Sequence, residues 1–113
     1  MSIEISNCKI TVIKRTIDQD LINEYIAEEY RDHMKPCEIF TDKQEFILEG
    51  EAAFQGPPPD FCASAWADIR KDIFTIAVGG DMPGLKQRGF TIAGCQDWFR
   101  PVIFKIERIN KSK

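Results

Sequence analysis

The stretch CASAWADIRKDIFTIA, residues 62–77, decides how the chain is expected to fold. Its apolar positions recur at intervals of four, three, four and three residues: Cys62, Trp66, Ile69, Ile73 and Ile76. That spacing places them on one face of an α-helix, with polar and charged residues on the opposite face. Two glycines and then a proline follow and end the pattern. We therefore predict a helix at about residues 61–78 that covers a sheet.

Four other stretches predict the strands of that sheet. CKITVIKR, residues 8–15, alternates apolar and polar side chains and puts Cys8 on the apolar, core-facing side. FTIAGC, residues 90–95, and PVIFKIERI, residues 101–109, predict two strands joined by the link QDWFR, and QEFIL, residues 44–48, predicts a short one. We expect the strands at 8–15 and 101–109 to belong to one sheet, because each needs cover for its apolar face.

The remaining stretches complete a small fold. Asp18 and Asp20 are candidate N-caps for an amphipathic helix at about residues 20–34, before Pro36. Residues 49–59 contain two glycines and three prolines, which predict a loop and one side of a cleft. The order β-α-β-α-β-β predicts a single α+β domain over residues 1–113, with a mixed or antiparallel sheet covered by two helices and a frayed tail at 110–113.

Composition and charge exclude several partners. The chain has 113 residues, with 15 basic and 18 acidic side chains and a net charge of −3. It is therefore not expected to bind the phosphate backbone of nucleic acid. No apolar run is long enough to cross a membrane, and the first ten residues lack the apolar core of a signal peptide. We expect a cytoplasmic protein, whose four cysteines are free, metal-binding or reactive rather than joined in disulfides.

Cys62 is the first candidate for chemistry. Asp60 is the predicted N-cap, which would place Cys62 in the first helical turn, where free N–H groups and the helix dipole favour a thiolate. Trp66, one turn later on the same face, would cover one side of this thiol. The alternative interpretation is that Cys62 is a small buried residue of the apolar face.

The four cysteines together allow three interpretations. Their separations of 29, 25 and 33 residues contain no CxxC pair, so the spacing gives weak support for a metal site. Their predicted places, on strands and next to helix ends, would still allow them to converge in a small domain. The candidates are a zinc or iron site, a redox pair such as Cys62 with Cys95, or unlinked core thiols. The candidate metal ligands are Cys8, Cys37, Cys62 and Cys95.

The stretch GCQDWFRP, residues 94–101, contains four chemically active side chains in a tight connection: Cys95, Asp97, Trp98 and Arg100. Arg100 would either bind a ligand carboxylate or pair with Asp97 as a structural clasp. Trp66 and Trp98 are the aromatic candidates for ligand contact, beside Arg100.

Taken together, FCASAWADI, GGD, CQDWFRPVIFKIER and the opening CKITVIKR resemble a family of short prokaryotic proteins of uncharacterised function. The likeness extends over nearly the whole chain, and it implies that the four cysteines are shared features with a joint role. The chain departs from the family pattern in two places. Trp98 stands where a glycine commonly follows the aspartate, and Asp42 and Lys43 stand where a glycine follows the second cysteine. The resemblance implies no particular activity.

Three functional hypotheses follow. The leading one is a protein that binds a metal ion or small ligand through a cysteine-containing site. The first alternative is an enzyme in which Cys62 is a nucleophile or redox thiol, aided by Cys95, Asp97 or Arg100. The second is a non-catalytic homo-oligomer with structural cysteines, paired through an exposed edge of the terminal strand KIERI.

Overall fold

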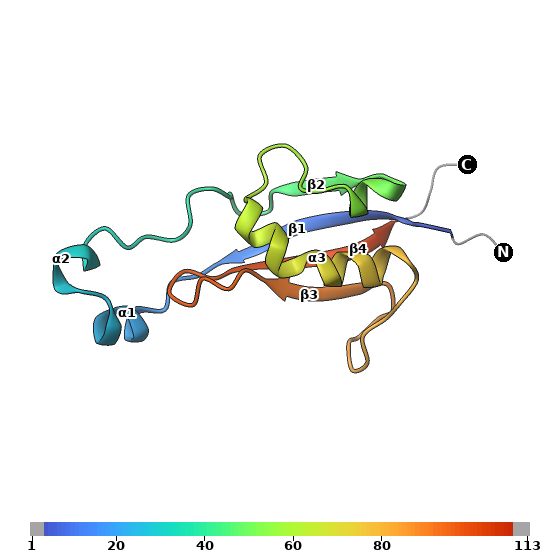
Figure 1. The fold of residues 1–113 in the computed structure, drawn as a ribbon. Helices are drawn as coiled ribbons and strands as arrows, with labels where there is room; N and C mark the ends of the chain where they lie inside the picture. The colour runs from blue at the N-terminus through green and yellow to red at the C-terminus, as the bar shows by residue number, and fades with distance from the viewer. Residues whose placement is uncertain (1–3, 110–113) are drawn as a thin grey trace.

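The computed structural model describes residues 4–109 as a four-stranded antiparallel sheet with one long helix across a single face (Figure 1). The strands lie in the order β2-β1-β4-β3. Their bounds are Asn7–Arg15 for β1, Glu45–Leu48 for β2, Phe90–Gly94 for β3 and Val102–Ile109 for β4. The predicted α+β class is confirmed, and so are the four predicted strands. The expected frayed tail at 110–113 lies outside the described residues.

The central pair of the sheet is β1 with β4. Their register runs from Asn7 opposite Ile109 to Arg15 opposite Val102, with an irregularity between Val12 and Lys14. This confirms that the first and last strands share a sheet. The expectation that KIERI is an exposed edge is wrong, because β4 pairs with β1 on one side and with β3 on the other. The two edge strands are short, which limits pairing with another chain.

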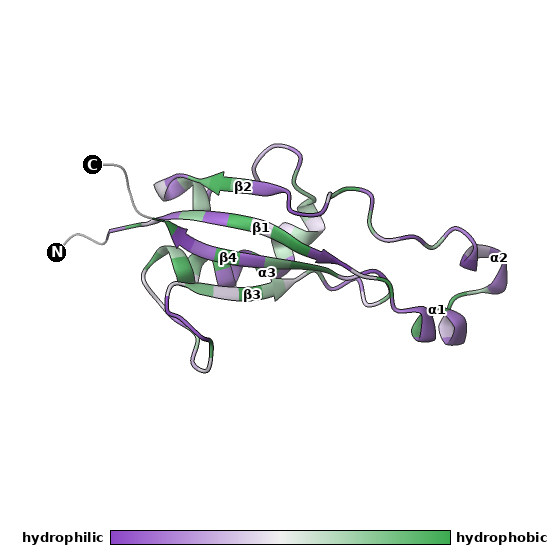
Figure 2. Cartoon of the chain, turned by 180° about the vertical axis from the view of Figure 1, so that it is seen from behind, coloured by the Kyte–Doolittle hydropathy of each residue, from purple (hydrophilic) through white to green (hydrophobic). Residues whose placement is uncertain are grey.

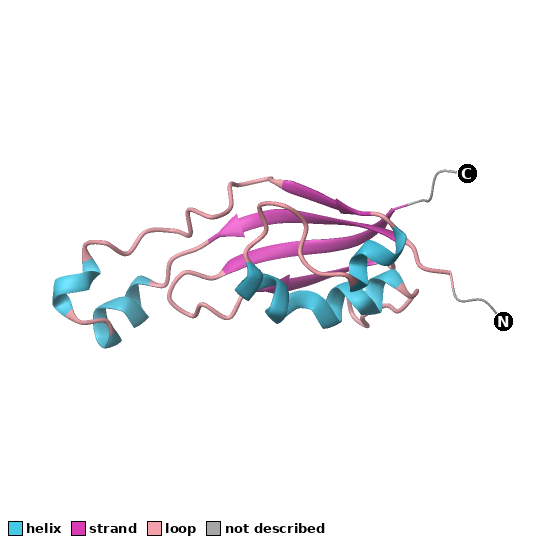
Figure 3. Cartoon of the chain, turned by 45° about the horizontal axis from the view of Figure 1, so that its top comes forward, coloured by secondary structure: helices cyan, strands magenta, loops and turns pink. Residues whose placement is uncertain are grey.

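Helix α3, Ala63–Ala77, covers one face of the sheet, as Figure 3 shows. The residues of its predicted apolar face from Trp66 to Ile76 are buried, together with Ala65 and Ala77. They pack against the inward side chains of β1 and β4, including Ile10, Phe104 and Ile106, which are fully buried. The side chains that recur at helical spacing on α3 and those that alternate along β1 and β4 therefore form one hydrophobic core.

The start of α3 differs from the prediction. Cys62 is the N-cap residue, and its carbonyl accepts the N–H of Trp66 at 2.9 Å. Asp60 precedes the helix in a left-handed conformation, with φ of 68°, so the predicted capping role of Asp60 is wrong. The reason is a tight turn after the prolines, in which the N–H of Phe61 donates to the carbonyl of Pro58 at 3.2 Å.

The segment predicted as an irregular loop at 49–59 contains a short 3₁₀-helix, η1, Gly50–Phe54. Ala53 is fully buried, and the ring of Phe54 lies 4.7 Å from that of Phe74 on α3. This segment packs on the helix, and it does not line the pocket described below. The expectation that it forms one side of a cleft is not met at this pocket and stays a prediction.

Residues 16–44 form an arm that leaves β1, extends beyond the end of the sheet and returns to β2 (Figures 1 and 3). It contains α1, Gln19–Tyr25, and α2, Glu28–Arg31. Asp18 caps α1, as predicted, by accepting the N–H of Leu21 at 3.2 Å.

The arm differs from the single helix predicted at 20–34. Ile26 is extended and separates α1 from α2, and Ile22 is the one buried residue that these two helices contribute. Tyr25 and Tyr30 remain 71% and 60% exposed. Periodic apolar residues define a face of a helix but do not supply a surface to cover it. Within residues 4–109, α3 is therefore the helix that covers the sheet, and the expected cover by two helices is wrong.

In the described part of the chain, the other face of the sheet carries no helix, and Figure 2 shows hydrophilic and hydrophobic residues mixed along its strands. Lys9 on β1 lies 3.6 Å from carboxylate oxygens of both Glu45 on β2 and Glu107 on β4. Such cross-strand charge pairs suit a face in contact with water. Within residues 4–109, no helix is long and apolar enough to cross a bilayer.

Candidate functional site: a pocket lined by three thiols

A pocket of about 420 Å³ lies where three segments meet: the start of α3, the connection from β3 to β4, and the end of the arm. Cys62, Cys95 and Cys37 come from these three segments in turn, and all three line the pocket. We call it the thiol pocket. Its wall also includes Phe40 and Val102, both buried, and the polar side chains of Ser64, Asp68, Asp97 and Arg100.

The backbone fixes Cys62 and Cys95. Cys62 is half-buried at the N-cap of α3, and its side chain makes no capping hydrogen bond. Cys95 directly follows β3, and its N–H donates to the carbonyl of Val102 at 3.1 Å. The N–H of Val102 in turn donates to the sulfur of Cys95 at 3.2 Å. One thiol is therefore set by the helix and the other by the end of the sheet.

Cys37 lies on the arm and is held by Arg15, the last residue of β1. Arg15 Nη1 donates to the carbonyl oxygen of Cys37 at 2.9 Å, and Arg15 Nε donates to Asp42 Oδ1 at 3.0 Å. The hydrogen bond from Arg15 lowers the pKa of Asp42 below its ordinary value. Arg15 therefore attaches the returning segment of the arm, at Cys37 and at Asp42, to the end of the central strand β1.

The link between β3 and β4 contains the predicted clasp. Asp97 Oδ2 accepts Arg100 Nε at 3.2 Å, while Asp97 Oδ1 accepts the backbone N–H groups of Phe99 and Arg100 at 3.2 and 3.1 Å. Asp68 on α3 accepts the N–H of Gln96 at 2.7 Å and joins this link to the helix. Arg100 is both clasp and pocket wall, because its side chain is 39% exposed and lines the pocket.

Cys8 lies at the opposite end of the sheet. It is fully buried, and burial raises the pKa of its thiol to about 11 despite the nearby positive charge of Arg108. Cys8 and Arg15 are seven residues apart on β1, which corresponds to roughly 20 Å along a strand. Since Arg15 holds Cys37, a site that joins all four thiolates, as considered for zinc or iron, does not fit this sheet.

No preassembled metal site is found in the described part of the chain. Within residues 4–109, no group of three or more His, Cys, Asp or Glu side chains is arranged to hold a metal ion. The three thiols of the pocket therefore share a wall without forming a closed coordination shell.

The two tryptophans predicted as ligand contacts lie elsewhere. Trp66 is buried in the core, with its ring 5.8 Å from that of Phe61, and Trp98 is 66% exposed on the β3–β4 link. Among the described residues, Phe40 is the aromatic side chain of the pocket wall instead. Its ring lies 5.0 Å from Phe61 and 5.2 Å from Phe104. The sequence analysis missed Phe40; its only signal was an apolar residue three positions after Cys37.

Comparison of the chain with protein-family models, with curated proteins and with solved structures found no match. The family resemblance of the cysteine-containing motifs stays a prediction. The pocket is therefore interpreted from its own geometry and chemistry.

Proposed function

We propose that the chain binds a small ligand in the thiol pocket, and that the thiols of Cys37, Cys62 and Cys95 contact it. The observation that supports this proposal is that three cysteines from three separate segments line one half-open pocket. Free cysteines that serve only in packing are usually buried, as Cys8 is. Cys37, Cys62 and Cys95 also pack against the hydrophobic core, but unlike Cys8 each stays partly exposed at the pocket wall.

The other side chains of the wall favour a ligand with two chemical parts. Arg100 and the first turn of α3 supply hydrogen-bond donors and positive potential on one side. Phe40 and Val102 supply an apolar floor. We propose a small molecule with a thiol-reactive or thiophilic centre and an anionic or hydrogen-bond-accepting group.

A metal ion is the other form of this proposal. Three thiolates suit zinc or another thiophilic ion, with water or the ligand in a fourth position. Binding would require the thiols to move closer together, because no metal group is preassembled within residues 4–109. The small ligand is preferred because it fits a pocket of about 420 Å³ without this movement.

Native-state alkylation with iodoacetamide, followed by peptide mass spectrometry, tests this proposal. Cys37, Cys62 and Cys95 should react at least about tenfold faster than Cys8, which is an internal reference because it is buried and stays protonated. Equally slow labelling of all four cysteines would mean that they only pack, and would overturn the proposal.

A second experiment asks whether the thiols act on one ligand. Phenylarsine oxide, whose trivalent arsenic bonds to two neighbouring thiols, should protect the pocket cysteines from alkylation. The double variant Cys37→Ser/Cys62→Ser leaves one pocket thiol and should lose this protection at Cys95, whereas the control variant Lys71→Ala, at an exposed residue of α3 outside the pocket wall, should retain it. Protection of Cys95 that is unchanged in the double variant would contradict a shared site. The same assay with Zn²⁺ in place of the arsenical distinguishes the metal form.

A further inference from the structure

The pocket holds two thiols that are fixed by the sheet and helix and one that is not. Resting on the proposal that the thiol pocket binds a small ligand, we propose that this ligand is a hydroperoxide. In this reaction Cys62 is the thiol that attacks, and Cys37 then forms a disulfide with it. These roles follow from how each of the three sulfur atoms is held.

Cys62 is the best placed of the three to attack. It lies at the N-cap of α3, a helix of 15 residues, and its side chain is not used in a capping hydrogen bond. The N–H groups of the first helical turn favour negative charge next to them. The sulfur of Cys95, in contrast, already accepts the N–H of Val102 at 3.2 Å.

Cys37 is the partner that no backbone ladder holds. Among the described residues, no backbone N–H between residues 35 and 40 donates to a backbone carbonyl. This part of the arm is held by Arg15 at the carbonyl of Cys37 and by the buried ring of Phe40. Cys95 and Cys62 are both attached to regular elements that pack together, so neither is expected to move without its strand or helix. A shift of residues 35–39 would bring Cys37 toward Cys62 without breaking a backbone hydrogen bond donated by these residues.

Arg100 in the pocket wall suits the negative charge that develops on the peroxide during the reaction. When the thiolate of Cys62 attacks a peroxide ROOH, an S–O bond forms, the O–O bond breaks and negative charge develops on the departing RO oxygen. Arg100, which lines the pocket, is placed to donate a hydrogen bond to that oxygen. The oxygen leaves as ROH after it takes up a proton, and Cys62 becomes a sulfenic acid.

The second step closes the disulfide. The Cys37 thiol gives up its proton and its sulfur attacks the sulfur of the sulfenic acid. An S–S bond forms, the S–O bond breaks to release hydroxide, and the hydroxide takes up the proton that Cys37 lost and leaves as water. In total, two thiols and one peroxide give one disulfide, one ROH and one water. Two electrons pass from the thiols to the peroxide, and an external dithiol returns the chain to its reduced state by exchange.

The test is reaction of the full chain with one equivalent of cumene hydroperoxide, followed by non-reducing peptide mapping. The expected product joins Cys37 to Cys62, with the loss of two hydrogens, in the wild type and in the control variant Cys8→Ala, whose buried thiol lies at the other end of the sheet. In Cys37→Ser the reaction should stop at the sulfenic acid, which dimedone traps on Cys62. Arg100→Gln should slow the oxidation of Cys62 at least about tenfold while leaving its alkylation by iodoacetamide unchanged.

Each other result overturns this inference. Absence of the Cys37–Cys62 product, pairing of Cys62 with Cys95, or a trapped sulfenic acid on a cysteine other than Cys62 would each do so. These failures are separate from failure of the proposed function. Rapid alkylation of the pocket thiols without peroxide-driven pairing would leave the ligand pocket in place and remove only the peroxide reaction.

Discussion

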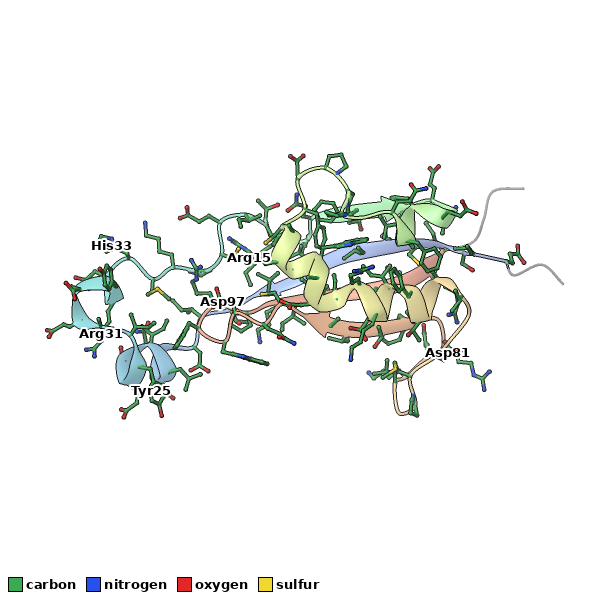
Figure 4. All side chains as sticks on the ribbon, in the orientation of Figure 1. Arg15, Tyr25, Arg31, His33, Asp81 and Asp97 are labelled. Atoms are coloured by element: carbon green, nitrogen blue, oxygen red, sulfur yellow. The ribbon has the colours of Figure 1, made fainter. Side chains whose placement is uncertain are left out.

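The two ends of helix α3 use the same residue types in opposite ways. At its C-terminal end, Arg108 Nη1 donates to the carbonyls of Ile76 and Gly80 at 2.9 and 2.6 Å, and Nη2 lies 2.8 Å from Asp81 Oδ1. Cys8 is buried beside this group. At the N-terminal end, an arginine and an aspartate again form a pair, Arg100 with Asp97, and three half-buried cysteines surround it. Figure 4 shows Asp81 and Asp97 at these two ends.

The difference lies in what each arginine bonds to. Arg108 satisfies carbonyl groups at the end of a helix, so its guanidinium closes that end of the core. Within residues 4–109, the guanidinium of Arg100 bonds to the carboxylate of Asp97 in its own turn, and Arg100 also lines the pocket. The C-terminal end of α3, which Arg108 closes, stabilises the fold. The N-terminal end, where Arg100 lines the pocket, is open and available for binding.

The largest expected effect tests the core that both ends share. Phe104 is fully buried, and its ring lies 5.2 Å from Phe40 and 5.5 Å from Phe61. Phe104→Ala should lower the free energy of unfolding by about 3–5 kcal/mol, because it leaves a cavity beneath the pocket. Urea unfolding followed by circular dichroism measures this change. Phe54→Ala, at a residue 39% exposed, is the control and should lose about 1 kcal/mol; equal losses would contradict the assignment of the core.

The next effect compares the two arginines directly. Arg108→Met should lower the free energy of unfolding by about 2 kcal/mol, because the carbonyl of Gly80 loses its charged partner while that of Ile76 keeps the N–H of Gly79. Arg100→Met should cost less than about 1 kcal/mol, since its ion pair with Asp97 is partly exposed. The two variants are measured by the same urea titration. A larger loss for Arg100→Met would reverse the distinction between a closed and an open end.

A smaller effect concerns alkaline pH and Cys8. Burial raises the pKa of Cys8 to about 11 in the folded chain, from an ordinary value of 9.0. Between these pH values the unfolded chain loses this proton while the folded chain keeps it, so stability should fall as the pH rises through this window. Thermal unfolding of the wild type and of Cys8→Ala at about pH 8 and pH 10.5 measures the difference. The variant should show the shallower loss, and parallel losses would show that Cys8 is not held protonated.

The smallest effect concerns acid and Asp81. Hydrogen bonds from the N–H of Gly89 and from Arg108 lower the pKa of Asp81 below its ordinary value of 3.8. The unfolded chain therefore takes up this proton first as the pH falls, and the stability that the carboxylate contributes is lost below about pH 4. Thermal unfolding between pH 5 and pH 2.5, roughly the range in which carboxylates titrate, should show a weaker pH dependence for Asp81→Asn than for the wild type. Identical pH dependence would mean that the hydrogen bonds of Asp81 with Gly89 and Arg108 do not stabilise the folded chain.

The sequence by itself determined the features that depend on neighbours along the chain. The intervals from Trp66 to Ile76 specify one face of a helix, and the alternation around Cys8 specifies one face of a strand, because these periods follow from backbone geometry. The clasp of Asp97 with Arg100 was predicted for the same reason, since three residues in a tight turn bring the two side chains together.

Only the tertiary structure decided which distant segments meet. The separations between the cysteines contain no information on the strand order β2-β1-β4-β3, yet that order brings Cys95 beside the residues that hold Cys37 and leaves Cys8 at the other end. The same order placed the KIERI strand in the centre of the sheet. The pattern at residues 20–34 likewise specified an apolar face but not a partner for it, and the helix divided at Ile26 because the arm extends past the sheet that would have covered it.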